Sequence, residues 1–437
     1  MNNPKPRSEP TAGAPSPARE IPRDRHFDAT LRVLLSEGYR YISTRCEELN
    51  TDIFRTRLLL QPAVCIRGEE AAKLFYDNAL VKRAGAAPKR IRKSLLGEGG
   101  VHGLDDEQHV NRKQMFLSLM TPANIEELRE LTLAAWKIQS ESWQKLDRVV
   151  LLEEAPQILC RAACEWAGIP LGKDLRARAR DLLAMVDAFG GLGPRYWRGT
   201  WARRRTERWI RQIIREIRAG TLRPTGDAAA SVVALHRDTE GALLDEQIAA
   251  VELINVIRPT VAVTYLIVFC ALALHLHPEE RGKVSDGNDL DGNSRALECF
   301  VQEVRRFYPF APVMGGIARK DIHWRGYRIP ANTLLVLDLY GTNHDPRSWS
   351  GPDEFRPARF GLWNGSPYNF IPQGGGDFEI GHRCAGEWIT IELLKIAVRF
   401  LTTNIRYEVP AQDLRVPMNR MPSRPAGGFV MEKVQSV

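Results

Sequence analysis

The sequence predicts a mainly α-helical protein with a minor β region. Apolar residues recur with a helical period along much of the first half, for example over Ile125 to Leu146. A nearly continuous apolar run from Val261 to Leu274 is typical of a buried core helix. Only short strand-like runs, such as Leu334 to Leu339, lie near the two ends of the core region. Together these observations favour a helix-dominated body.

The start of the chain has the composition of a tail. Residues 1–24 are rich in proline, serine, alanine and charge and show no periodicity. Such a segment buries too little apolar area to offset the entropy of ordering, so we expect it to be disordered. Residues 25–437 are expected to form one catalytic domain with a single large core. Within it, runs at Arg57 to Leu60 and Ala63 to Ile66 predict a small sheet.

One long helix is expected near the middle of the domain, from Asp245 to Leu276. Asp245 is suited to cap its first turn, and Pro278 stops it. The apolar run inside it is interrupted by Thr264 and Tyr265 and is short for a membrane span, so no span is expected.

The segments after this helix alternate in type. A Gly/Asp/Asn-rich loop at Ser285 to Asn293 precedes a helix over Cys299 to Tyr308. Strand-like runs at His323 to Ile329 and Leu334 to Leu339 follow, and a final helix begins after Cys384.

The formal charge of +8 raises the question of nucleic-acid binding, because arginines cluster between Arg195 and Arg218. Apolar residues recur among them at helical spacing, from Trp209 to Ile217. That pattern describes an amphipathic surface helix, so we expect no nucleic-acid partner.

The cysteines argue for a reducing compartment. There are seven, an odd number without paired spacing, and no secretory segment precedes them. Cys160 and Cys164 lie four residues apart but lack matching histidines, so a metal site there is not expected. We expect a cytoplasmic protein.

The strongest chemical signal is the segment from Phe370 to Glu387, in which a glycine-rich loop delivers Cys384 just before an apolar helix. A thiolate at a helix start is stabilised by unpaired amides, and glycines let a flat macrocycle approach the backbone. An isolated cysteine is more often an inert small hydrophobe, so the surrounding residues decide between the two interpretations.

Three further residues supply that context. Glu303 and Arg306 lie one helical turn apart, and Arg359 follows in Phe355-Arg-Pro-Ala-Arg-Phe360. On physical grounds the first two could be an exposed ion pair. With the cysteine loop, however, this order resembles the cytochrome P450 superfamily, where such residues form a buried charge network. The resemblance implies the P450 fold, with haem b between the long helix and the loop and Cys384 on the iron.

The loop also departs from the commonest P450 pattern, because Ile380 stands where a glycine is usual and Gly381 follows it. Together with the run Gln373 to Gly376, this resembles the bacterial fatty-acid peroxygenase branch. That likeness extends over nearly the whole chain after about residue 25. It implies hydrogen-peroxide-dependent hydroxylation of long-chain fatty acids at the α or β carbon, with decarboxylation to terminal alkenes as a competing outcome.

Arg258 and Pro259 lie in the middle of the long apolar helix. The proline removes a backbone donor, and an arginine there would be costly to bury unpaired, so an anion should meet it. That anion could be a structural carboxylate of the protein. The resemblance implies instead that Arg258 binds the fatty-acid carboxylate, which then serves as the acid–base group for peroxide cleavage.

His102 stands between glycines, where a lone histidine is usually a loop residue with local hydrogen bonds. The resemblance places it near the distal haem face. Further roles implied by the resemblance are contacts to the haem propionates by His109 and Lys113, helped by Arg83 and His382, and a substrate channel formed by Leu96, Phe189, Ala311 and Val313. Ordinary core packing is the alternative for the channel residues.

Two rival functions remain open. One is a monooxygenase supplied with electrons by a redox partner, although Arg258 and Pro259 replace the acid–alcohol pair that such enzymes carry. The other is a non-catalytic haem sensor. The peroxygenase interpretation requires no redox partner.

Overall fold

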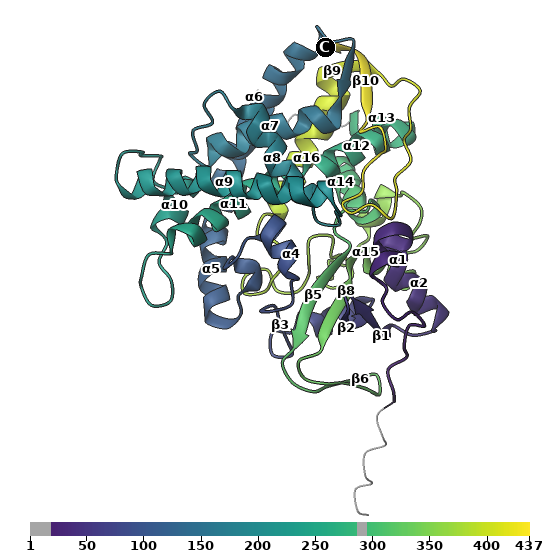
Figure 1. Ribbon diagram of the computed structural model, residues 1–437. Helices are drawn as coiled ribbons and strands as arrows, with labels where there is room; N and C mark the ends of the chain where they lie inside the picture. Colours follow the sequence, from purple (N-terminus) through teal and green to yellow (C-terminus); the bar gives the residue numbers. More distant parts are fainter. Residues whose placement is uncertain (1–18, 286–294) are drawn as a thin grey trace, which may run out of the picture.

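The computed structural model describes residues 19–285 and 295–437. Helices form a large body, and the main sheet forms a smaller region at one end of it (Figure 1). The predicted helix-dominated fold with minor sheet is confirmed.

The N-terminal boundary of the folded part differs from the expectation. Residues 1–18, and most of the Gly/Asp/Asn-rich loop, lie outside the described residues. Residues 19–24, expected to be disordered, lie against the sheet region: Ile21 is buried, and the Tyr41 hydroxyl donates to Asp24 at 2.6 Å. The expected boundary at residue 24 is therefore wrong, because one apolar residue and one buried carboxylate attach this stretch to the core.

The sheet region contains one five-stranded sheet in the order β1-β2-β8-β5-β3. Strand β2 pairs parallel with β8, and the other pairs are antiparallel. The predicted runs near residues 57–66 form the β1–β2 hairpin. The strands of this sheet are β1 (Ile53–Leu58), β2 (Gln61–Ile66), β3 (Val81–Lys82), β5 (Val313–Ala318) and β8 (Leu334–Asp338). The remaining strands are β4 (Arg148–Val150), β6 (Ile322–Trp324), β7 (Tyr327–Ile329), β9 (Ile405–Glu408) and β10 (Val430–Ser436).

The helices that precede the central one include α9, which is the predicted amphipathic helix. Its apolar residues Ile210, Ile213 and Ile214 are buried, while the arginines at 204, 205 and 208 are exposed. This first set is α1 (Thr30–Arg32), α2 (Tyr41–Glu48), α3 (Glu69–Phe75), α4 (Lys89–Ile91), α5 (Asp106–Ser118), α6 (Pro122–Trp143), α7 (Leu151–Trp166), α8 (Leu175–Asp187), α9 (Pro194–Arg218) and α10 (Ala229–Leu235).

The expected long helix is present but interrupted. It consists of α11 (Glu246–Ala262) and α12 (Thr264–Leu276), and Asp245 caps it by accepting hydrogen bonds from the amides of Gln247 and Ile248. The interruption at Val263 follows Pro259, whose nitrogen has no hydrogen to donate to the preceding turn. Residues 246–276 are long and apolar enough to cross a membrane, but 83% of their most apolar window is buried inside the protein. They form a core helix.

The helices after the central one carry the residues of the predicted charge network and the cysteine loop. They are α13 (Pro278–Ser285), α14 (Arg295–Phe307), α15 (Leu339–Asn343) and α16 (Glu387–Arg399). Helix α16 packs against α6, α12 and α14, so the end of the cysteine loop is held by the core.

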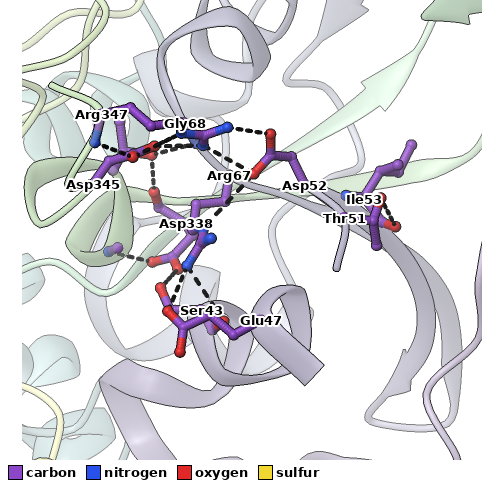
Figure 2. Close-up of polar contacts among 12 residues, drawn as sticks. Ser43, Glu47, Thr51, Asp52, Ile53, Arg67, Gly68, Asp338, Asp345 and Arg347 are labelled. Carbon is purple, nitrogen blue, oxygen red and sulfur yellow. Dashed lines mark hydrogen bonds and ion pairs between the residues drawn. The ribbon is translucent and has the colours of Figure 1, made fainter. Parts of the chain in front are cut away.

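Figure 2 shows a polar network where α2 and the start of β1 meet the end of β8. Arg347 donates to Asp52 at 2.6 and 2.9 Å and to Asp345 at 2.6 Å. Asp338 accepts from the Ser43 hydroxyl at 2.7 Å. A surface cavity of about 520 Å³ lies beside these residues, but its lining includes none of the predicted site residues. The network attaches the N-terminal helices to the sheet.

Candidate active site

Cys384 lies three residues before α16, as the sequence predicts. Its amide donates to the Gln373 carbonyl at 3.2 Å, and the Gln373 side-chain nitrogen lies 3.8 Å from the sulfur. Close packing explains the glycines of this loop: a Cβ on Gly375 would come within 2.4 Å of the Pro367 carbonyl oxygen. The loop is thus a compact support for one thiol.

The protonation of this thiol differs from the simple helix-start expectation. Burial raises the pKa of Cys384 above its usual value, and the Glu387 carboxylate raises it further. The Gly386 amide, Lys113 and Arg305 act in the opposite direction without overcoming burial. The protein alone therefore favours the neutral thiol, and a coordinated metal cation would favour the thiolate.

A set of charged side chains fixes the segment around Cys384. Arg305 donates to Glu387 at 2.5 Å and to the Gln373 side-chain oxygen at 2.9 Å. Arg383 donates to the other oxygen of Glu387 at 2.6 Å. Because Arg305 and Glu387 are both buried, these charge-assisted bonds hold the loop and the start of α16 in one arrangement.

The predicted charge network is present and buried. Arg306 makes two parallel bonds to Glu303, each 2.8 Å long, and Arg359 donates to the same carboxylate at 3.1 Å. Neither Glu303 nor Arg306 has exposed surface, so the exposed-pair interpretation is wrong. Arg306 also donates to the Asn343 carbonyl, and the Asn343 side chain accepts from the Ile371 amide at the start of the cysteine loop.

Replacing Arg306 with methionine is expected to destabilise the protein by about 3 to 5 kcal/mol, because the buried Glu303 would lose its two-bond partner and keep the Arg359 guanidinium and the Arg356 amide. Arg306→Lys keeps the charge without the paired geometry and should cost less. Urea unfolding of both variants tests this. Arg415→Ala, which removes an exposed pair, serves as the control and should leave unfolding unchanged. An Arg306→Met protein as stable as the wild type would contradict the assigned role.

Arg258 is buried on α11 without a carboxylate partner among residues 19–285 and 295–437. The hydrogen bond recorded for its guanidinium goes to the Asn255 side-chain oxygen at 3.2 Å, and its Nε is buried without a partner in this described part. Burial, together with the nearby Arg203, lowers the pKa of Arg258 to about 9, although Cys384 acts in the opposite direction. The structural-carboxylate alternative is therefore not supported.

His102 belongs to the same region. It lies in a short helical turn, Val101–Gly103. Burial, together with Arg258 and His382, lowers the pKa of His102 to about 3. Its side chain nevertheless has accessible surface. His102 is thus accessible to solvent, yet surrounded by enough protein to disfavour its charged form.

The residues predicted to hold an anionic group also gather. The rings of His109 and His382 lie 3.8 Å apart, and His382 lies 3.8 Å from the Asp105 carboxylate. Burial lowers the pKa of His109 to about 3 and that of His382 to about 4.

Two longer basic side chains lie beside these rings. Lys113 donates to the Arg383 carbonyl, and burial lowers its pKa to about 8. Arg83 donates to the Gly315 carbonyl at 3.2 Å, but its Nε is buried and has no partner within the described ranges. The Asp105 carboxylate contacts this group through His382, and the Arg83 Nε remains without an acceptor in the described part.

The four predicted channel residues come from three segments of the chain. Leu96 ends the short helical turn Arg92–Leu96, Phe189 follows α8, Ala311 precedes β5, and Val313 begins it. All four are partly exposed. Their membership of one channel stays a prediction.

Comparison with known proteins agrees with this geometry. The cytochrome P450 family model matches residues 295–434, which contain Glu303, Arg306, Arg359 and Cys384. Cytochrome P450SP alpha (CYP152B1), solved in complex with (R)-ibuprophen, is 44% identical; the alignment covers 93% of this chain and 99% of that one, with a TM-score of 0.90. The chain belongs to the cytochrome P450 family.

Further relatives refine the position of this P450. Cytochrome P450EX alpha (CYP152N1), solved with myristic acid, is 42% identical over 96% of this chain and 100% of that one, with a TM-score of 0.92. The predicted peroxygenase branch is thereby confirmed. Cytochrome P450 3A11 of Mus musculus is 27% identical over 192 residues. That alignment spans only 37% of the mouse protein, so it supports the family and not the branch.

This P450 family implies haem held by a cysteine thiolate, and the residues present fit that group. Cys384 offers a sulfur at the end of a supported loop, and Arg83 offers a buried guanidinium nitrogen that lacks a partner in the described part. The basic side chains at 83, 109, 113 and 382 suit carboxylates such as haem propionates.

Sequence reasoning missed one residue of this P450 site. Glu252 has no exposed surface and lies six residues before Arg258 on α11. The signal that would have identified it is the one that identified Arg258, a charged residue inside an apolar helical run. The sequence identifies Gln373 as part of the loop but does not predict its contact with Cys384.

Proposed function

We propose that the protein is a haem b peroxygenase that oxidises long-chain fatty acids with hydrogen peroxide. One observation carries this proposal: Arg258 is a buried cation without a protein carboxylate among the described residues, and its pKa responds to Cys384. A carboxylate held there would lie within electrostatic reach of the metal ligand. The acids solved with the relatives, myristic acid and ibuprophen, carry such a group.

Arg258 can bind a carboxylate through two parallel hydrogen bonds, because its guanidinium is planar and, with a pKa of about 9, charged at neutral pH. Pro259 follows it on α11, so no acid–alcohol pair is available at this point to move protons. The bound substrate carboxylate is then the group placed to accept and return a proton of peroxide. Held in this way, the substrate exposes only its α and β carbons to oxidation, by proximity.

Haem bound through a thiolate supplies cleavage of the peroxide O–O bond and oxidation of a nearby C–H bond. In hydroxylation, one peroxide oxygen enters the C–H bond and the other leaves as water. In decarboxylation, the β hydrogen and the carboxyl hydrogen are removed, CO₂ departs, an alkene forms and both peroxide oxygens leave as water.

The remaining site residues take supporting roles in this proposal. His102, neutral and beside Arg258, is placed to hydrogen-bond peroxide or the substrate carboxylate. His109 and Lys113, with Arg83 and His382, hold the haem propionates. Leu96, Phe189, Ala311 and Val313 line the substrate channel.

Peroxide supplies both oxygen and oxidising equivalents, so this function needs no redox partner. A reductase-dependent monooxygenase would need a proton relay at the position where α11 carries Arg258 and Pro259. We place the enzyme in the cytoplasm, because the cysteines other than Cys384 are free and buried.

Incubation of the purified haem-loaded protein with palmitate and hydrogen peroxide, without any reductase, tests the proposal. Mass spectrometry should detect 2- or 3-hydroxypalmitate, with pentadecene as a competing product. Palmitate recovered unchanged with peroxide, but oxidised when a reductase and NADPH are supplied, would favour the monooxygenase.

The low pKa of His102 predicts its behaviour across pH. A histidine whose folded pKa is about 3 is neutral throughout the range of about pH 5.5 to 8, so it contributes no ionisation there. His102→Gln should therefore change the rate or the ratio of alkene to alcohol while keeping the shape of the pH–rate profile. Disappearance of an ionisation near pH 6 to 7 in this variant would show that His102 titrates in the wild type.

A further inference from the structure

Glu252 is a buried carboxylate to which the proposed function gives no role. Its Oε1 accepts from the Val101 amide at 2.8 Å and from Arg112 at 2.6 Å. Its Oε2 accepts from the Asn255 side-chain nitrogen at 3.0 Å. Both oxygens are therefore occupied, and this carboxylate joins α11 to two other segments of the chain.

The bond to Asn255 has a consequence for Arg258. A carboxylate can only accept hydrogen bonds, so the Asn255 amide must direct its NH₂ toward Glu252. Its carbonyl oxygen then faces the other way and accepts from Arg258 at 3.2 Å. Glu252 thereby sets the orientation of the acceptor that holds the guanidinium.

The bond to Val101 connects Glu252 to the segment that carries His102. Val101 directly precedes His102, and the loop before it packs tightly on α11. A Cβ on Gly100 would come within 2.9 Å of Val251 and 3.0 Å of the Asn255 side-chain nitrogen. One carboxylate therefore fixes both the acceptor beside Arg258 and the backbone that carries His102.

Arg112 balances the charge of Glu252, since the pair is 2.6 Å apart and has little exposed surface. Because Glu252 contacts Arg258 only through the neutral Asn255, it orients the guanidinium without occupying it. A carboxylate placed directly on Arg258 would instead compete with a ligand for the same donors. This indirect connection keeps Arg258 available to an external anion.

We propose that Glu252 is a positioning residue that holds Arg258, through Asn255, and the His102 backbone, through Val101, in the geometry that binds the substrate carboxylate. The inference rests on the proposed function, because it assumes that Arg258 binds that carboxylate.

The test compares two variants of the haem-loaded enzyme in equilibrium binding of labelled palmitate. Glu252→Gln presents an NH₂ group to one of its donors, which favours a reversed Asn255 amide. Asn255→Ala removes the acceptor but leaves the pair of Arg112 and Glu252 intact, so it remains informative if the first variant folds poorly. Each change should weaken palmitate binding by about tenfold, and the double variant should lose no more than the larger single effect, because both act along one path.

Two controls separate positioning from general damage. Glu246→Gln, an exposed position at the start of α11, should bind palmitate normally. The absorption spectrum of the thiolate-bound haem should be unchanged in all variants, because haem binding does not use Arg258. Parallel loss of this spectrum and of palmitate binding would indicate a structural defect and overturn the inference.

The remaining outcomes are also decisive. If the wild type binds palmitate and both Glu252→Gln and Asn255→Ala bind it equally tightly, the positioning role is overturned but the proposed function is not. Failure of the wild type to bind palmitate would overturn the proposed function, and the positioning role with it.

Discussion

Replacing Cys384 with serine is expected to abolish palmitate oxidation and the absorption signature of thiolate-ligated haem. The reason is chemical: a serine hydroxyl is a far weaker donor than the thiolate that favours O–O cleavage. The loss should exceed the roughly 10- to 100-fold effect of a residue that merely supports a metal ligand. Absorption spectroscopy of the reduced carbon monoxide complex, with iron content per chain, measures the ligand directly.

Cys299→Ser is the matched control, since Cys299 is a buried thiol on α14 that the site does not use. It should keep the spectrum and the activity. A Cys384→Ser protein with the thiolate spectrum would show that another cysteine binds the iron.

Replacing Arg258 with alanine should reduce palmitate turnover by about 30-fold to several thousandfold. Truncating one partner of a buried, hydrogen-bonded charge pair costs about 2 to 5 kcal/mol, and the substrate carboxylate would be that partner. Arg258→Lys should retain part of the activity, because it keeps the charge but loses the paired geometry. The haem spectrum should be unchanged in both variants.

Replacing Arg258 should not destabilise the substrate-free protein, although it reduces turnover. Without substrate, Arg258 is a buried charge with no carboxylate partner among the described residues, so Arg258→Met should unfold at the same or a higher urea concentration than the wild type. Arg215→Ala on the exposed side of α9 is the control for both measurements. Strong destabilisation by Arg258→Met would reveal a structural role for the arginine.

The parts of the molecule that follow from local sequence patterns were predictable. The cysteine loop, the Asp245 cap and the amphipathic helix of Trp209 to Ile217 each depend on neighbouring residues, and the structure contains all three. The pairing of Glu303 with Arg306 follows from helical spacing, but its complete burial does not. That burial depends on α14 packing against α16 and the segment around Arg359.

The parts that depend on long-range contacts were not predictable. Glu252 meets Val101 and Arg112 across 151 and 140 residues of sequence, so no local pattern connects them. The attachment of Ile21 to the sheet core likewise could not be read from its Pro-rich surroundings. The raised pKa of Cys384 reflects burial, which outweighs the favourable helix start that the sequence suggested.

The most direct test of the role of the substrate carboxylate compares palmitate with its methyl ester in wild-type enzyme supplied with hydrogen peroxide. The ester keeps the chain but removes the anion that Arg258 binds and the group that moves the peroxide proton. Palmitate should be oxidised, and the ester should be oxidised at least about 100-fold more slowly, matching the effect of losing a buried charge pair. Equal turnover of acid and ester would contradict this role, because the carboxylate would then have no part in catalysis.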